Sequence, residues 1–159
     1  MEHTNNGSLS DFIDLHSSLK EYINEASLLN MFLQCIKALK YLHSKNIIHK
    51  SIRPNHLLMS NEKLIKLELC PDLNKIEVYN PPENKSSEKD KFTEKCDIYS
   101  LGCVFYQVCF LVKFDEFLNE PKKFQQFEKA DTEYSKEFLN IIKSMVDNDP
   151  NKRPSSEEL

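Results

Sequence analysis

Residues 47–59, IIHKSIRPNHLLM, gather the side chains of this sequence whose types and spacing could do chemistry. A serine near a histidine, here Ser51 and His49, could supply the nucleophile and base of a hydrolase. Side chains two positions apart seldom pair, and no acid stands in this part of the sequence, so we favour structural loop residues. Arg53 could bind an anion or pair with a carboxylate, and the second interpretation is favoured.

Composition limits the class of protein. A chain of 159 residues, 40% hydrophobic and 29% charged, can bury one core, which predicts one globular domain. The net charge of −4 and the scattered basic residues argue against a nucleic-acid partner. The five cysteines include no Cys-x-x-Cys pair, which favours reduced thiols in a cytoplasmic protein over a zinc site.

No membrane partner is expected either. The N-terminus has neither the basic start nor the apolar core of a signal peptide or an anchor. The longest apolar run, residues 98–112, is too short to span a bilayer and therefore predicts a helix buried in a protein core.

Helical spacing of apolar residues predicts further helices on both sides of this run. One covers residues 7–20, with a capping box of Ser8 and Asp11 and a buried face of Leu9, Phe12, Ile13 and Leu19. A second covers residues 24–45, with Asn24 as N-cap and Leu28, Phe32, Cys35, Ile36, Leu39 and Leu42 facing inward. Residues 121–130 indicate a weak helix, and residues 135–146 a good one capped by Ser135, with Phe138, Leu139, Ile142, Met145 and Val146 buried.

Between these helices the pattern changes. Short apolar pieces at residues 47–49, 57–59 and 63–69 predict small strands, with a turn at Asn61 and Glu62. The polar residues 81–95 predict a solvated loop ahead of the buried helix.

Five short motifs then occur in a specific order. They are MEH followed by GSL, YLHSKNIIHKSIRPNHLL, YNPPE, CDIYSLGCVFYQV and DPNKRPSSEEL. In this order they make the chain resemble the C-terminal lobe of a eukaryotic protein kinase, and their wording is closest to the NIMA-related serine/threonine kinases. The resemblance covers residues 1–159 as one domain and implies a mainly α fold, a helical bundle with a few short β-strands around the catalytic loop. It places Met1 at the hinge, so we expect these residues to lack the small lobe.

The resemblance assigns structural roles to residues that match the family. Asp97 is expected to hold the catalytic-loop backbone, Glu83 and Arg153 to form a buried ion pair, and His49 to pack as a structural member of the loop. Leu58 is expected to form the floor under adenine, with Glu2 and Thr4 also on the adenine side.

The catalytic positions depart from the family. Phosphoryl transfer needs a carboxylate base, an Asn and an Asp that bind magnesium, and a Lys near the phosphates. The resemblance places Ser51 at the position of the base, and His56 and Leu69 at those of the Asn and the Asp. It places Arg53 at the position of the Lys. A register slip that offers Asn55 or Glu68 instead is disfavoured because neighbouring side chains on extended backbone point to opposite faces. We therefore expect neither ATP nor magnesium as a cofactor. Residues 69–83 contain no Ser or Thr, so Tyr79 is the one hydroxyl there that could be phosphorylated.

Three hypotheses follow. The first and favoured one is a kinase-like domain that has lost catalysis, a pseudokinase or scaffold that binds a protein partner through its exposed surface. The second is a fragment of an active serine/threonine kinase, which would use ATP and magnesium. The third is a truncated gene product without function, whose exposed apolar surface would favour aggregation.

Overall fold

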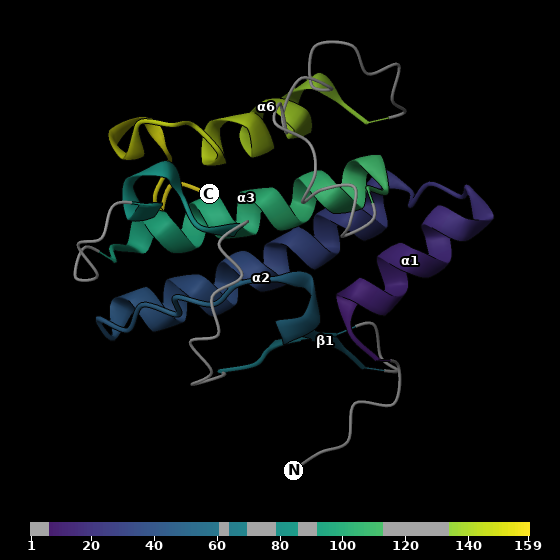
Figure 1. Cartoon of the computed structure of the whole chain (residues 1–159), viewed down its shortest axis with the longest axis horizontal. Coiled ribbons are helices and arrows are strands. Elements are labelled where there is room, and N and C mark those ends of the chain that lie inside the picture. Colours follow the sequence, from purple (N-terminus) through teal and green to yellow (C-terminus); the bar gives the residue numbers. More distant parts are fainter. Residues whose placement is uncertain (1–6, 61–63, 70–78, 86–91, 113–133) are drawn as a thin grey trace.

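The computed structural model describes residues 7–60, 64–69, 79–85, 92–112 and 134–159. These residues form a mainly helical fold with one two-stranded sheet, which confirms the expected fold class. Figure 1 shows α3 between α2 and α6, with α1 and the sheet beside α2. The elements are α1 (Leu9–Leu19), α2 (Glu25–Ser44), η1 (Pro54–His56), β1 (Leu57–Met59), β2 (Ile65–Leu67), η3 (Pro82–Lys85), α3 (Glu94–Phe110), α6 (Lys136–Met145) and η4 (Pro150–Lys152), where η marks a 3-10 helix.

The helix α1 begins at the predicted capping box. The Ser8 side chain accepts from the backbone N–H of Asp11, and the Asp11 carboxylate accepts from the backbone N–H of Ser8 at 2.7 Å. Leu9 and Ile13 are buried as expected. The prediction for Leu19 is wrong, since that side chain is 55% exposed. It lies six positions after Ile13, which at 3.6 residues per turn places it on another face of the helix.

The helix α2 forms as predicted and packs its buried face into the core. Asn24 caps it through a hydrogen bond from the backbone N–H of Ser27, and all six apolar side chains expected to face inward are buried. The Phe32 ring packs edge-on against Phe105 of α3 and Phe138 of α6, with ring centroids 5.0 and 5.6 Å away. One aromatic ring therefore joins three helices, and edge-to-face packing adds to the area that it buries.

The helix α3 is buried on all sides from Cys96 to Cys109, as expected of the apolar run. A Cβ added at Gly102 would stand 2.7 Å from Cγ1 of Val146, so the glycine is what lets α3 and the end of α6 approach closely. The prediction of a solvated loop for residues 81–95 is wrong at both ends. Pro81 is buried ahead of η3, and the last two residues already belong to α3.

The helix α6 confirms the expected N-cap and buried face. Ser135 accepts from the backbone N–H of Phe138, and the predicted apolar side chains are buried. The expected helix at residues 121–130 and the turn at residues 61–62 lie outside the described residues. No helix in the described parts of the chain is long and apolar enough to cross a membrane.

The small sheet pairs β1 with β2 antiparallel, with Leu58 opposite Lys66. The backbone N–H of Met59 donates to Gly7, which ties the sheet to the residues before α1. Residues 47–49 form no strand, contrary to the prediction, because their backbone finds other partners. The backbone N–H of Ile47 donates to the carbonyl of Leu42 at the end of α2, and that of His49 donates to the carboxylate of Asp97 on α3.

Candidate functional site

Asp97, in the first turns of α3, anchors the segment that follows α2. Its carboxylate is 1% exposed and accepts hydrogen bonds from the backbone N–H groups of His49 at 2.7 Å and Lys50 at 2.8 Å. Lys50 has a φ of 65°, a left-handed conformation that a non-glycine residue adopts at a cost. The two hydrogen bonds from Asp97 hold the backbone at that point, and this is the contact expected of Asp97.

Asp97 also reaches the end of the chain through a residue that sequence reasoning missed. Nε2 of His43, on α2, lies 3.0 Å from the same carboxylate and must donate, because a carboxylate only accepts. Nδ1 of His43 is 3.0 Å from the hydroxyl of Ser156. A histidine among the leucines of the buried face of α2 was the signal available in the sequence. The buried chain of Ser156, His43 and Asp97 connects three distant segments.

His49 packs inside the loop as a neutral imidazole. The backbone N–H of Ser51 donates to its Nδ1 at 3.3 Å, so the proton resides on Nε2, which donates to the carbonyl of Glu68 at 2.9 Å. Burial lowers the pKa of His49, and the opposing effect of Asp97 is smaller. His49 thus links the loop to the end of β2 and does not bond to the hydroxyl of Ser51, which contradicts a hydrolase pair.

Ser51, Arg53 and His56 bond to one another. Nδ1 of His56 donates to the carbonyl of Ser51 at 2.7 Å and lies 3.2 Å from the hydroxyl of Ser51. Nε of Arg53 donates to Nε2 of His56 at 2.9 Å. Among the described residues Arg53 forms no ion pair with a carboxylate, so the favoured interpretation of this arginine as a carboxylate partner finds no support there. Both nitrogens of His56 are used within the loop.

The remaining residues of the predicted site are dispersed. Leu58 is half-buried on β1, where it forms an isolated bridge with Ser8. Leu69 follows β2 and its side chain is 62% exposed. Glu2 and Thr4 lie outside the described residues. The structure therefore brings Ser51, Arg53 and His56 together, and it places Leu69 on the surface.

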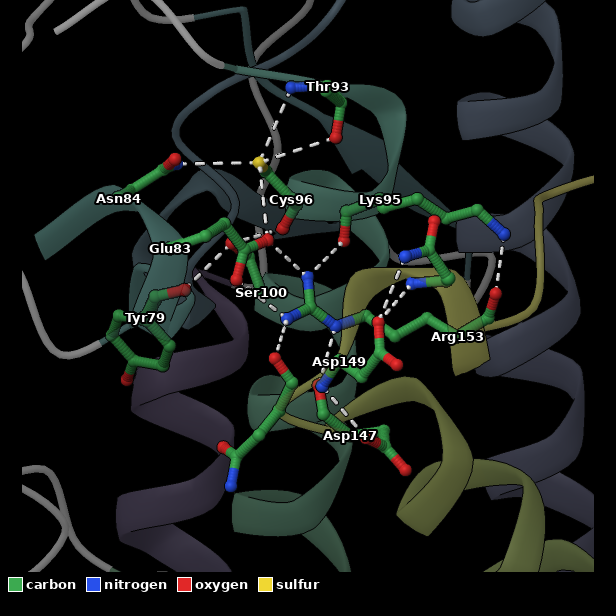
Figure 2. Close-up of polar contacts among 12 residues, drawn as sticks. Tyr79, Glu83, Asn84, Thr93, Lys95, Cys96, Ser100, Asp147, Asp149 and Arg153 are labelled. Carbon is green, nitrogen blue, oxygen red and sulfur yellow. Dashed lines mark hydrogen bonds and ion pairs between the residues drawn. The ribbon is translucent and has the colours of Figure 1, made fainter. Parts of the chain in front are cut away.

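Glu83 and Arg153 form the expected ion pair. Nη1 and Nη2 of Arg153 donate to the two carboxylate oxygens at 2.6 and 2.8 Å, a two-pronged contact seen in Figure 2. The Arg153 side chain is 0% exposed and that of Glu83 is 25% exposed. Nε of Arg153 also donates to the carbonyl of Asp147 at 2.7 Å, and the guanidinium lies over the Tyr99 ring. Burial alone would raise the pKa of Glu83, but the hydrogen bonds and charge of Arg153 lower it.

Tyr79, the possible acceptor of a phosphate, is 3% exposed. Its hydroxyl donates to the side-chain carbonyl of Gln107 on α3 at 2.5 Å, and its backbone carbonyl accepts from Ser100 at 2.8 Å. Burial raises the pKa of this hydroxyl well above its usual range. A hydroxyl so placed is unavailable to another enzyme while the domain stays folded.

Among the residues that the structure describes, the donor set around the loop does not fit magnesium. Magnesium takes oxygen ligands in octahedral geometry, commonly one or two carboxylates with water. At the two positions that the resemblance assigns to the metal stand His56, whose free lone pair accepts from Arg53, and the apolar side chain of Leu69. No group of three or more His, Cys, Asp or Glu side chains in the described residues could hold a metal ion.

Comparison of the sequence with known proteins identifies the family to which the chain belongs. The model of the protein kinase domain matches residues 1–159, and the chain therefore belongs to the protein kinase domain family. It is 28% identical to the serine/threonine-protein kinase Nek8 of Danio rerio, over 100% of this chain and 25% of that protein. It is 27% identical to the serine/threonine-protein kinase nekl-2 of Caenorhabditis elegans, over 100% of this chain and 50% of that protein.

These matches confirm the resemblance to NIMA-related kinases, at low identity. The chain spans half or less of the length of these relatives.

Proposed function

We propose that this chain is a pseudokinase, a protein-kinase domain that does not transfer phosphate and acts instead by binding a protein partner. The observation that supports the proposal most is the hydrogen-bonded set of Ser51, Arg53 and His56. A kinase needs a carboxylate to accept the proton of the substrate hydroxyl, and a serine hydroxyl cannot accept it near neutral pH.

Loss of the base and of both metal ligands would remove most of the rate. Removal of one group that stabilises the transition state costs about two to three powers of ten, and such losses do not add simply. The contacts of Asp97 and the pair of Glu83 with Arg153 meanwhile support a folded domain. A sequence drifting without selection has no reason to keep these framework contacts and lose only the reactive groups.

The exposed surface supports a binding role. Leu15, Leu19 and Tyr22, on α1 and just beyond it, are 56%, 55% and 59% exposed. Large exposed apolar side chains that gather in one segment are typical of protein interaction sites. The proposal places the domain in the cytoplasm, with no cofactor and with neither nucleic acid nor membrane as a partner.

A second candidate function is that of a segment of an active serine/threonine kinase. The names of the similar proteins favour it, since they are serine/threonine-protein kinases of which this chain spans a part. In that case ATP and magnesium would bind together with residues outside the described part of the chain.

Thermal unfolding of the purified chain with ATP, with and without magnesium, separates the candidates. The proposal predicts a cooperative transition whose midpoint magnesium does not raise in the presence of ATP. A rise that requires both ATP and magnesium would contradict it and favour the active kinase. Absence of any cooperative transition would instead favour a truncated product without function.

A further inference from the structure

One side of α1 is both acidic and apolar. Its exposed residues recur at helical spacing and continue just beyond the helix, and we call them the α1 face: Asp11, Asp14, Leu15, Ser18, Leu19, Glu21 and Tyr22. The three apolar members, Leu15, Leu19 and Tyr22, are large exposed side chains. Residues 9–22 contain three carboxylates and one lysine, a net charge of −2. The α1 face therefore combines negative charge with apolar surface.

The outer side of α2 has the opposite charge. Its exposed residues also recur at helical spacing and continue past the helix, and we call them the α2 face: Leu33, Lys37, Lys40, Tyr41, Ser44, Lys45 and Ile47. Residues 33–47 contain three lysines and no Asp or Glu. Lys40 pairs with Glu157 at 2.5 Å, so the face keeps a net charge of +2. Its apolar members Leu33, Tyr41 and Ile47 are large exposed side chains too.

The two faces complement each other in charge and in character. Each presents three apolar side chains among charged ones, and the charges are opposite in sign. Opposite charges steer two surfaces together and fix their orientation, while the apolar side chains gain from leaving water. The faces cannot meet within one chain, because the opposite sides of both helices are fixed in the core through residues such as Ile13 and Phe32. A second copy of the chain, by contrast, presents the matching face.

We propose that the chain associates with a second copy of itself through contact between the α1 face of one copy and the α2 face of the other. The inference rests on the part of the proposed function that assigns a binding role to the exposed surface. With three apolar side chains from each copy the interface is small, so the association is weak and depends on salt. Because each copy carries both faces, the contact can repeat from one copy to the next or close on a twofold axis.

Analytical ultracentrifugation of the full chain, with charge reversal on each face, tests the proposal. The weight-average mass of the unmodified chain should rise between about 10 μM and about 1 mM protein. Reversal of the α1 face by D14K with E21K, or of the α2 face by K37E with K45E, should weaken the association about tenfold or more, because like charges then meet. An equimolar mixture of the two variants should associate again, since each reversed face matches the reversed face of the other.

The matched control is K136E with K152E. These substitutions reverse two exposed cations on α6 and η4 and change the net charge as much as K37E with K45E does. The control should associate as the unmodified chain does. If circular dichroism shows that a reversed variant is unfolded, the neutral variants D14N with E21Q and K37Q with K45Q carry the test, and both should weaken the association.

Three results would overturn the proposal. A chain that stays monomeric over the whole concentration range would show that the two faces do not bind each other and would leave them to a different protein. Equal association of the reversed and control variants would place the contact elsewhere on the surface. A mixture of the two reversed variants that stays monomeric would contradict the pairing of the two faces. A separate assay of phosphate transfer decides whether the domain is a pseudokinase, so failure of the contact and failure of the proposed function give different results.

Discussion

Replacement of Arg153 by methionine should destabilise the domain severely. The substitution removes both hydrogen bonds to Glu83, at 2.6 and 2.8 Å, and the one to the carbonyl of Asp147 at 2.7 Å. It also leaves the carboxylate of Glu83, three quarters covered, without its cation. Loss of one partner of a buried ion pair costs about 3–5 kcal/mol in the free energy of unfolding. For a chain of this size that corresponds to a decrease of about 6–20 °C in Tm.

The chain contains no tryptophan, so urea unfolding should be followed by far-UV circular dichroism and extrapolated linearly to water. The control is K152M, which removes the exposed cation next to Arg153 and should change the free energy of unfolding by less than about 0.5 kcal/mol. If R153M proves too unstable to purify, R153K should show a smaller loss, since lysine cannot make the two-pronged contact. A loss below about 1 kcal/mol for R153M would refute the assignment of this pair as a main stabilising contact.

Three further variants test separate contacts. The first variant is E83Q. Because the pKa of Glu83 in the folded chain is below its usual 4.5, the stability that this carboxylate contributes is complete above pH 4.5 and is lost as the pH falls through the folded pKa. E83Q should therefore flatten the decrease in the free energy of unfolding below pH 4.5, measured by urea unfolding across pH. G102A should lower the free energy of unfolding by about 1–3 kcal/mol, since the new Cβ would meet Val146 at 2.7 Å, and this clash outweighs the better helix propensity of alanine. A stabilised variant would contradict the close approach of α3 and α6. Y79F should lower the free energy of unfolding by about 1–3 kcal/mol, because it leaves the side-chain carbonyl of Gln107 without its donor. Ready phosphorylation of Tyr79 in the folded protein would contradict the observed burial of this side chain.

The helices α1, α2 and α6 could be predicted well because each carries both a period and an N-cap. Ser8, Asn24 and Ser135 are short polar residues ahead of apolar repeats, and all three are N-caps in the structure. The extent of a buried face was harder to predict. Leu19 is apolar, yet it lies in the last turn of α1 and off the buried stripe. Apolar periodicity therefore predicts that a segment is a helix more reliably than it predicts which residues of its last turn are buried.

The contacts between segments could be predicted only through the family resemblance. Glu83 and Arg153 are 70 positions apart, and no local pattern indicates that they meet. His43 and Ser156 were missed because one lies in an apolar helix and the other in a polar tail, and only tertiary packing brings them to Asp97. The short apolar piece at residues 47–49 was misassigned for the same reason, since a buried carboxylate takes the backbone donors that a strand would have used.

Transfer of phosphate from radiolabelled ATP to a general protein acceptor, in the presence of magnesium, tests whether this domain catalyses the reaction. A pseudokinase should incorporate no more label into the acceptor, or into itself, than a heat-denatured sample of the same protein. Incorporation that requires both magnesium and the folded chain would contradict the proposed function and would make this domain an active kinase.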